Sequence, residues 1–274
     1  MGKGLKTKQE IESCVAELGE KQAWNHNFVL PHGIETRPGV QSSHGKNLVK
    51  WDRIKPVLED IGISSKRVLD IGCNEGFFSF KLHDYGAEVL GVDIDQHRLE
   101  KAMFISDILE KSEVEFRNLS IYDQELSELP NFDFCLCLGF LHRIPDPFSA
   151  LQKLADKSDI ILLEWKALKF GPHDESFAYF TPGGYDEKDY YGTQFWVLSY
   201  ACVEAILSRL GFDRFHRIDD PGSRRAILVA GRVDNPVFSR PDLILSRNRL
   251  RSILSHTKRY FSMLVKIITG RVNA

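Results

Sequence analysis

The sequence has few cysteines, and none of them has the spacing that metal-binding or redox motifs require. The five are odd in number, include no CxxC pair and lie among apolar residues: Cys14, Cys73, Cys135, Cys137 and Cys202. A disulfide framework or a cysteine-rich zinc site would need paired spacings. The pattern therefore predicts no metal and no disulfide, and it favours buried thiols in a reducing compartment.

Long hydrophobic runs are also missing. The first ten residues, MGKGLKTKQE, are polar, and no apolar run near the C-terminus approaches the roughly 18 residues of a membrane-spanning helix. We therefore expect a cytoplasmic protein. Peripheral contact with the inner face of a membrane stays open, because it needs no such run.

The chain has little net charge, with a formal value of −2, so no overall field attracts a polyanion. The charge is unevenly distributed, since residues 240–274 carry eight Lys or Arg against one acid. This segment is +7 and the rest is −9. Its apolar residues have the spacing of one helix face, which predicts a basic amphipathic helix. Such a helix can lie on an anionic membrane, bind RNA phosphates or dock on protein.

With 274 residues and 43% hydrophobic composition, the chain can bury one substantial core. A short apolar run at 68–71 predicts a first strand, and the series continues with predicted strands at 88–92, 113–117, 132–138 and 159–163. Helical patterns follow at 75–85, 96–110 and 199–210, and Asp146 with Pro147 is typical of a further helix start. Alternating strands and helices predict a parallel sheet covered on both faces.

The last two predicted strands, 212–218 and 226–231, are joined by a turn too short for a crossover helix. They must therefore be antiparallel. The sequence predicts an α/β fold with a mostly parallel seven-stranded sheet and an antiparallel last strand. This is the Rossmann-like architecture of class I methyltransferases, whereas dinucleotide-binding folds usually keep that strand parallel.

The segment RVLDIGCNEGFF, residues 67–78, predicts a nucleotide-binding turn. Gly72 allows a tight turn and close approach of backbone amides to a ligand, and Gly76 allows close packing at the helix start. Asp70 would lie near a cationic end of the ligand. Asp93 ends the next strand, where it can accept hydrogen bonds from both ribose hydroxyls, and no P-loop lysine is present.

These motifs resemble the S-adenosylmethionine-binding motifs of class I methyltransferases, with Asn74 in place of a common middle glycine. Asn also accepts left-handed backbone angles. The segments KWDRIKPVLEDI, FDFCLCLGFLHRIPDPFSAL and RRAILVAGR further resemble the tRNA wobble-uridine carboxymethyltransferases of the 5-oxyacetic acid pathway and related methyltransferases. The resemblance implies cofactor contacts at Lys50, Gly72, Asp93, Ile94, Asp95, Ile121, Tyr122, Leu138, His142 and Arg225.

The resemblance to the tRNA enzymes is incomplete. They hold the extra carboxylate of a carboxylated cofactor with a lysine, a tyrosine and an arginine, of which Arg225 alone is clearly kept, and His142 replaces the tyrosine. The upstream segment AWNHNFVLPHGIETRPG instead resembles the W-x-H…G-x-x-T-x-x-G pattern of related small-molecule methyltransferases. We therefore expect ordinary S-adenosylmethionine as the donor.

Methyl transfer from a sulfonium to a hydroxyl needs an oriented acceptor and a base that removes its proton. His142 follows the fourth strand at the carboxyl edge of the sheet, where it is a candidate base or a pocket-lining residue. Glu164 ends the fifth strand at the same edge and is a second candidate, with a structural role favoured. Further residues lie in segments expected to fold over the site: His26, His44, His173 and Asp174.

We expect three parts: an N-terminal helical or lid extension at 1–50, a methyltransferase domain at 51–235 and the basic tail at 236–274. The segment 166–196, rich in Tyr, Phe and Gly, predicts an acceptor-binding insertion or a packed flap. The leading hypothesis is O-methylation of a small-molecule or saccharide acceptor. The alternatives are tRNA wobble-uridine modification, which the acidic body disfavours, and a non-enzymatic relative that only binds cofactor.

Overall fold

The computed structural model describes residues 7–38, 41–167, 175–180, 196–218 and 225–239, and it describes the backbone but not the side chains of residues 41–46. The predicted tail lies outside this range apart from residues 236–239, as do His173, Asp174 and most of the predicted insertion. Among the described residues, no helix has the length and apolar character needed to cross a bilayer. The same residues include no group of three or more His, Cys, Asp or Glu that could hold a metal.

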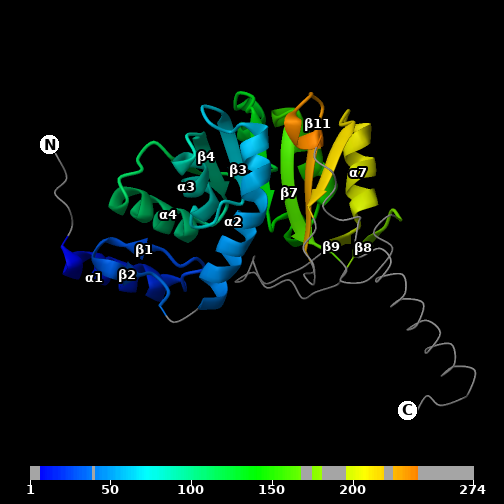
Figure 1. Cartoon of the computed structure of the whole chain (residues 1–274). Coiled ribbons are helices and arrows are strands. Elements are labelled where there is room, and N and C mark those ends of the chain that lie inside the picture. Colours follow the sequence, from blue (N-terminus) through cyan, green and yellow to red (C-terminus); the bar gives the residue numbers. More distant parts are fainter. Residues whose placement is uncertain (1–6, 39–40, 168–174, 181–195, 219–224, 240–274) are drawn as a thin grey trace, which may run out of the picture.

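A seven-stranded sheet forms the centre of the molecule, in the order β10-β11-β7-β6-β3-β4-β5 (Figure 1). Its strands are β3 (Arg67–Ile71), β4 (Glu88–Asp93), β5 (Glu115–Asn118), β6 (Phe134–Leu138), β7 (Ile160–Lys166), β10 (Arg214–Ile218) and β11 (Arg225–Gly231). The pairs among β3 to β7 are parallel, whereas β11 runs antiparallel to both β7 and β10. The predicted mostly parallel sheet with an antiparallel last strand is confirmed.

Helices cover both faces of this sheet, as predicted. One face packs α2 (Gln41–Ile61), α3 (Phe77–Asp84) and α4 (Gln96–Ile108), and the other packs α5 (Gln124–Glu128), α6 (Pro147–Lys157) and α7 (Tyr200–Arg209). Alternate strand residues serve the two cores, so Val68 faces the first and Leu69 the second. The caps expected from sequence are present, with the Asp146 side chain accepting from the amides of Phe148 and Ser149.

The N-terminal segment consists of α1 (Lys8–Lys21) and the short strands β1 (Val29–Leu30) and β2 (Ile34–Glu35), which pair antiparallel. Figure 1 shows α1, β1 and β2 together at the end of the molecule where α4 lies. The expected boundary at residue 50 falls inside α2, which runs unbroken from 41 to 61. A second antiparallel pair, β8 (Ala178–Phe180) with β9 (Trp196–Leu198), lies within the predicted insertion and just after it.

Candidate functional site

The turn between β3 and α3 has the backbone shape that its sequence predicts. Gly72, Asn74 and Gly76 have φ values of 72°, 55° and 78°. A Cβ on Gly72 would lie 2.9 Å from the Phe140 ring, and one on Gly76 would lie 2.8 Å from Phe116. Only a glycine fits without strain at these two positions, and asparagine tolerates the left-handed region at the third.

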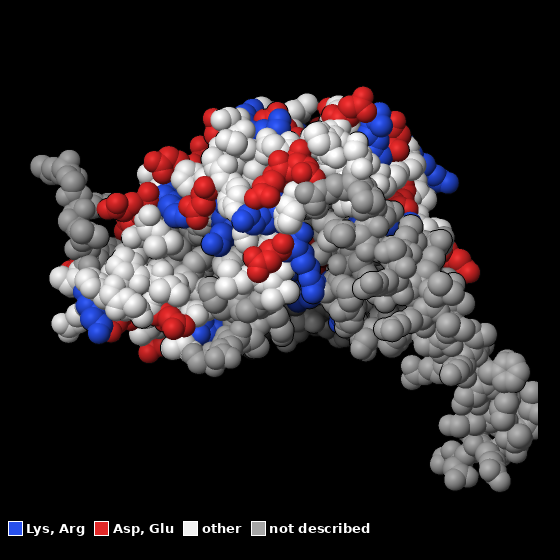
Figure 2. Space-filling view, in the orientation of Figure 1, with Lys and Arg blue, Asp and Glu red and all other residues white. Residues whose placement is uncertain are grey.

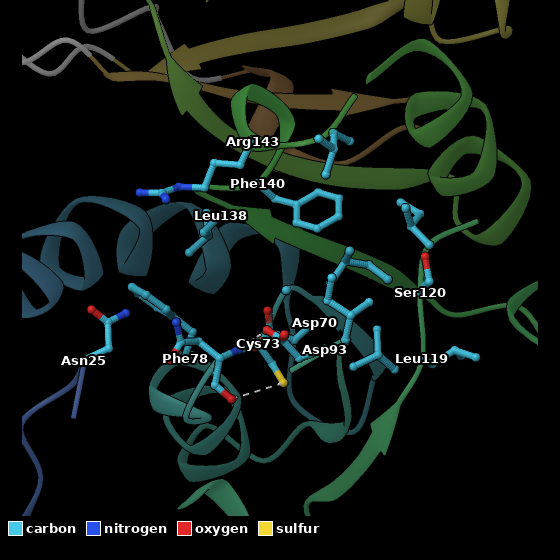
Figure 3. A pocket seen from close by; sticks show the side chains of 18 of the residues that line it. Asn25, Asp70, Cys73, Phe78, Asp93, Leu119, Ser120, Leu138, Phe140 and Arg143 are labelled. Atoms are coloured by element: carbon cyan, nitrogen blue, oxygen red, sulfur yellow. Dashed lines mark hydrogen bonds between the residues drawn. The ribbon is translucent and has the colours of Figure 1, made fainter. Parts of the chain in front are cut away.

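This turn opens onto a cavity of about 530 Å³ at the carboxyl ends of β3, β4 and β6 (Figure 3). Its size is typical of a small-ligand site. Of the residues predicted to bind cofactor, those that line the cavity are Lys50, Asp70, Gly72, Asn74, Asp93, Ile94, Ile121, Tyr122 and Leu138. The predicted residues outside the lining are Gly76, Asp95, His142, Glu164 and Arg225. The prediction therefore places most, but not all, of its residues at one site.

Asp93 holds the glycine turn in position. Its carboxylate is buried and accepts hydrogen bonds from the amide of Asn74 at 2.9 Å and from that of Asp95 at 3.0 Å. Asp95 itself does not face the cavity; its side chain caps α4 and accepts from Gln22. A carboxylate has about four lone-pair positions, so Asp93 retains capacity for hydroxyl donors of a ligand.

Asp70 lies beside Asp93 in the cavity wall (Figure 3). Burial and, to a smaller extent, the neighbouring Asp93 raise the pKa of the Asp70 carboxyl to about 7. The hydroxyl of Ser79, which donates to this carboxyl at 2.6 Å, opposes the shift. Two buried carboxyl groups side by side favour a cationic ligand.

The opposite wall is apolar. Leu138 ends β6 and Phe140 follows it, and both face the space above Asp70 and Asp93 in Figure 3. Ile121 is buried, whereas the ring of Tyr122 is partly exposed and its hydroxyl donates to the carbonyl of Asp146 at 2.7 Å. An apolar wall facing hydrogen-bonding groups suits a flat heterocycle attached to a ribose.

Glu164 lies behind the cavity between two cations. Its side chain is fully buried, with one oxygen 3.1 Å from Lys50 Nζ and the other 3.3 Å from Arg225 Nε. Pairing of a buried carboxylate with two cations favours a structural role for Glu164 over a catalytic one. Arg225 thus acts on the site through Glu164, and Lys50 reaches the cavity wall.

His142 is buried behind the cavity, and both of its ring nitrogens contact the protein. It is 2% exposed, and its Nδ1 accepts the backbone amide of Lys166 at 3.2 Å. Burial, together with the nearby cations Arg225 and Arg143, lowers its pKa to about 2, so the ring is neutral. Its Nε2 lies 3.5 Å from the guanidinium of Arg225, so both ring nitrogens face hydrogen-bond donors of the protein. These contacts favour a structural role over either alternative that the sequence left open.

Asn25 and Glu75, which were not assigned to the site, belong to its surroundings together with His26, which lies in a segment expected to fold over it. Asn25 and His26 line the cavity from the N-terminal segment, and Asn25 is seen reaching it in Figure 3. Both of their backbone amides donate to the carboxylate of Glu75, in the glycine turn. The sequence pattern AWNHNF indicated that this segment could contribute to the site, but no rule about residue spacing would have paired it with Glu75.

The sheet order, the antiparallel β11 and the glycine turn are those of the class I methyltransferase fold. Residues 63–184 match the family model described as a methyltransferase domain. This part of the chain is therefore a methyltransferase domain, and the predicted class I methyltransferase fold is confirmed.

Two kinds of curated relative are similar to the chain. A ubiquinone biosynthesis O-methyltransferase of Alkalilimnicola ehrlichii is 32% identical over 112 residues, covering 41% of this chain and 44% of the relative. A tRNA U34 carboxymethyltransferase of Nautilia profundicola is 31% identical over 115 residues, covering 40% of this chain and 35% of the relative. The match thus spans less than half the length of each relative.

Among solved structures, the N-terminal domain of EvdMO1, crystallised in the presence of SAH and D-fucose, aligns with a TM-score of 0.65. The alignment covers 84% of this chain and 99% of that domain, at 21% identity. This likeness confirms the fold over most of the chain.

Proposed function

We propose that the protein transfers a methyl group from S-adenosylmethionine to a hydroxyl of a small-molecule or saccharide acceptor. The observation that carries the proposal is the cavity itself, which joins the glycine turn and Asp93 to a wall supplied by the N-terminal segment. Bound S-adenosylmethionine supplies an electrophilic methyl group and its own leaving group. The protein then has to orient the acceptor and receive a proton.

The residues of the site fit this cofactor. Asp93 can accept from the ribose hydroxyls while it holds the glycine turn, and Ile121, Leu138 and Phe140 offer an apolar wall for the adenine. Asp70 can face the positive charge of the cofactor, because its carboxyl group becomes ionised as the pH rises through about 7. Five further polar or charged lining residues would face the acceptor: Asn25, His26, Asn47, Lys50 and Arg143.

A small acceptor is favoured because Asn25 and His26 form a wall of the cavity on the side of the N-terminal segment. This wall leaves less room for a large acceptor to enter from that side. The similarity to an O-methyltransferase of ubiquinone biosynthesis supports a hydroxyl acceptor. The solved EvdMO1 domain, studied with D-fucose, supports a saccharide as one class to test.

The second candidate is methyl or carboxymethyl transfer to a tRNA wobble uridine, which the similarity to a tRNA U34 carboxymethyltransferase favours. The charge of the chain argues against it, because residues outside 240–274 sum to −9. On the face shown in Figure 2, acidic and basic side chains are interspersed over the described residues. Plain S-adenosylmethionine is favoured as donor because a carboxylate of the protein, Glu164, already pairs with Lys50 and Arg225.

The roles of the separate parts are also proposals. We infer that the methyltransferase domain at 51–235 binds the cofactor and that the extension at 1–50 closes one side of its cavity. The insertion at 166–196 would contact the acceptor, and the basic tail at 236–274 would hold the protein on an anionic membrane surface.

Mass spectrometry of any nucleoside that copurifies, with calorimetry using S-adenosylhomocysteine, tests the cofactor. Radiolabelled S-adenosylmethionine is then incubated with catechols, deoxyhexoses and tRNA transcripts in parallel. We expect binding of the plain cofactor and label in a small-molecule fraction. Absence of binding would refute the function, whereas label in tRNA alone would favour the second candidate.

A further inference from the structure

The N-terminal segment fixes His26 against the glycine turn. The carboxylate of Glu75 accepts the backbone amide of His26 at 2.6 Å and that of Asn25 at 2.8 Å. From the other side, the hydroxyl of Thr36 donates to the carbonyl of His26 at 3.0 Å. The backbone of His26 is therefore held at both its amide and its carbonyl, which fixes where its ring enters the cavity wall.

Glu75 is fully buried and is held as a carboxylate by cations. Arg98 lies 2.7 Å from Oε1, and Lys101, itself fully buried, lies 3.5 Å from the same oxygen. Lys101 also donates to the carbonyls of Gln22 and Ala23. The Glu75 carboxylate is thus fixed on the Nδ1 side of the His26 ring.

The His26 ring lies between this carboxylate and the cavity. Its side chain is 9% exposed, with Nδ1 4.0 Å from Glu75 Oε2. Within the described part of the chain Nδ1 makes no hydrogen bond. The rings of Phe28 and Phe77 pack edge-on against the imidazole, at centroid distances of 6.2 and 5.8 Å. A buried ring nitrogen next to a carboxylate favours the tautomer with the proton on Nδ1.

The ring is neutral and so retains a lone pair. Burial lowers the pKa of His26 to about 4; Glu75 opposes this shift, and the cations Arg98, Lys50 and Arg37 add to it. His142 differs, because its Nδ1 is occupied by the amide of Lys166. Of the two buried histidines at this edge, His26 alone lines the cavity.

We propose that His26 is the general base of the methyl transfer and that Glu75 is its positioning residue. The inference rests on the proposed function. An acceptor oxygen forms a bond to the cofactor's methyl carbon, whose bond to sulfur breaks with the electron pair going to sulfur. The hydroxyl proton goes to Nε2 of His26, the fixed charge of Glu75 stabilises the imidazolium, and the proton then passes to solvent.

The tautomer of His26 tests this without an acceptor. Proton–nitrogen correlation spectra of the imidazoles are recorded at neutral pH in the complex with S-adenosylhomocysteine, and His26→Gln assigns the signal among nine histidines. We expect a neutral ring protonated on Nδ1 with a bare Nε2. A ring protonated on Nε2, or on both nitrogens, would overturn the proposal. In Glu75→Gln the Nδ1-protonated form should lose population; an unchanged tautomer there removes Glu75 from its role.

Turnover supplies the second test, with any acceptor that the wild type methylates. His26→Gln should lower kcat by about a hundredfold or more, the usual contribution of a base, while the Kd for S-adenosylhomocysteine stays nearly unchanged. The matched control is His97→Gln, because His97 lies 3.3 Å from Glu100 in an exposed pair away from the cavity. Equal turnover in His26→Gln and wild type refutes the base, whereas absence of cofactor binding in the wild type refutes the proposed function instead.

Discussion

Asp93→Ala is the sharpest test of the cofactor site, because one carboxylate both holds the glycine turn and would accept the ribose hydroxyls. The substitution removes the acceptor for the amides of Asn74 and Asp95. A hydrogen bond to a charged group contributes about 1.5–3 kcal/mol. Loss of that much binding free energy weakens affinity by roughly 10- to 150-fold. Calorimetric titration with S-adenosylhomocysteine measures this change in Kd directly.

The same substitution should lower the free energy of unfolding. Asn74 is buried, and without the Asp93 carboxylate its backbone amide loses the acceptor of its hydrogen bond. Leaving a buried donor unsatisfied costs about 1–3 kcal/mol. Urea unfolding followed by circular dichroism measures this loss separately from binding. Both effects should appear together, since they come from one carboxylate.

Asp133→Ala is the matched control. Asp133 also accepts a backbone amide, that of Arg67 at 2.8 Å. This contact is at the first residue of β3, whereas the cavity is at the opposite, carboxyl end of the strand. Its substitution should leave the Kd for S-adenosylhomocysteine unchanged. A folded Asp93→Ala protein with wild-type affinity, or an equal weakening in Asp133→Ala, would refute the reasoning.

Three further predictions follow from the site and the tail. The affinity for S-adenosylmethionine should rise as pH increases through about 7, because the raised pKa of Asp70 keeps this carboxyl neutral below that value and ionised above it. Calorimetry across this range checks it, with Asp70→Asn expected to remove the pH dependence. His142→Ala should lower the free energy of unfolding by about 1–3 kcal/mol, as buried truncations do, while turnover falls by less than about tenfold; urea unfolding and a methyl-transfer assay measure the two. Deletion of residues 240–274 should abolish cosedimentation with anionic liposomes and spare cofactor binding, and replacement of Phe261 and Leu264 by Ser should weaken the liposome binding without changing charge.

Each of these has a contrary outcome. Affinity that is flat or falls with pH would place the cofactor's positive charge away from Asp70. A hundredfold loss of turnover in a stable His142→Ala protein would restore His142 as the base in place of His26. Full-length protein that ignores anionic liposomes would refute membrane contact and favour docking of the tail on protein or RNA.

The central sheet was predictable because its signals are local. Most strands of the βα repeat are short and largely apolar. The turn after β3 needs positive φ at the positions where the sequence has Gly72, Asn74 and Gly76. Such preferences are set by the residue itself and by its immediate neighbours. They also bring Asp70 and Asp93 to one edge, since the carboxyl ends of parallel strands meet there.

The contacts that hold the N-terminal segment against the cavity could not be predicted from such local signals. Glu75 has the appearance of an ordinary acid near a helix start, yet its partners lie at Asn25 and His26, about fifty residues upstream, and at Arg98 and Lys101 downstream. Pairings at such separations leave no periodic pattern in one sequence. His142 shows the same limit, because its role depends on a backbone amide that comes 24 residues later.

Arg225 reaches the edge of the sheet next to the site because its strand, β11, runs antiparallel to its neighbour β7. The rule for parallel strands would not place it there. In a parallel sheet, only residues at the carboxyl ends of strands reach the binding edge. Since β11 runs antiparallel to β7, its first residue pairs with Lys166 at that edge, and Ile227 pairs with Glu164. Side chains two apart along a strand share a face, so the long Arg225 side chain reaches Glu164 diagonally. The antiparallel end of the sheet thus supplies one of the two cations that hold Glu164, and a parallel β11 would have put Arg225 at the opposite edge.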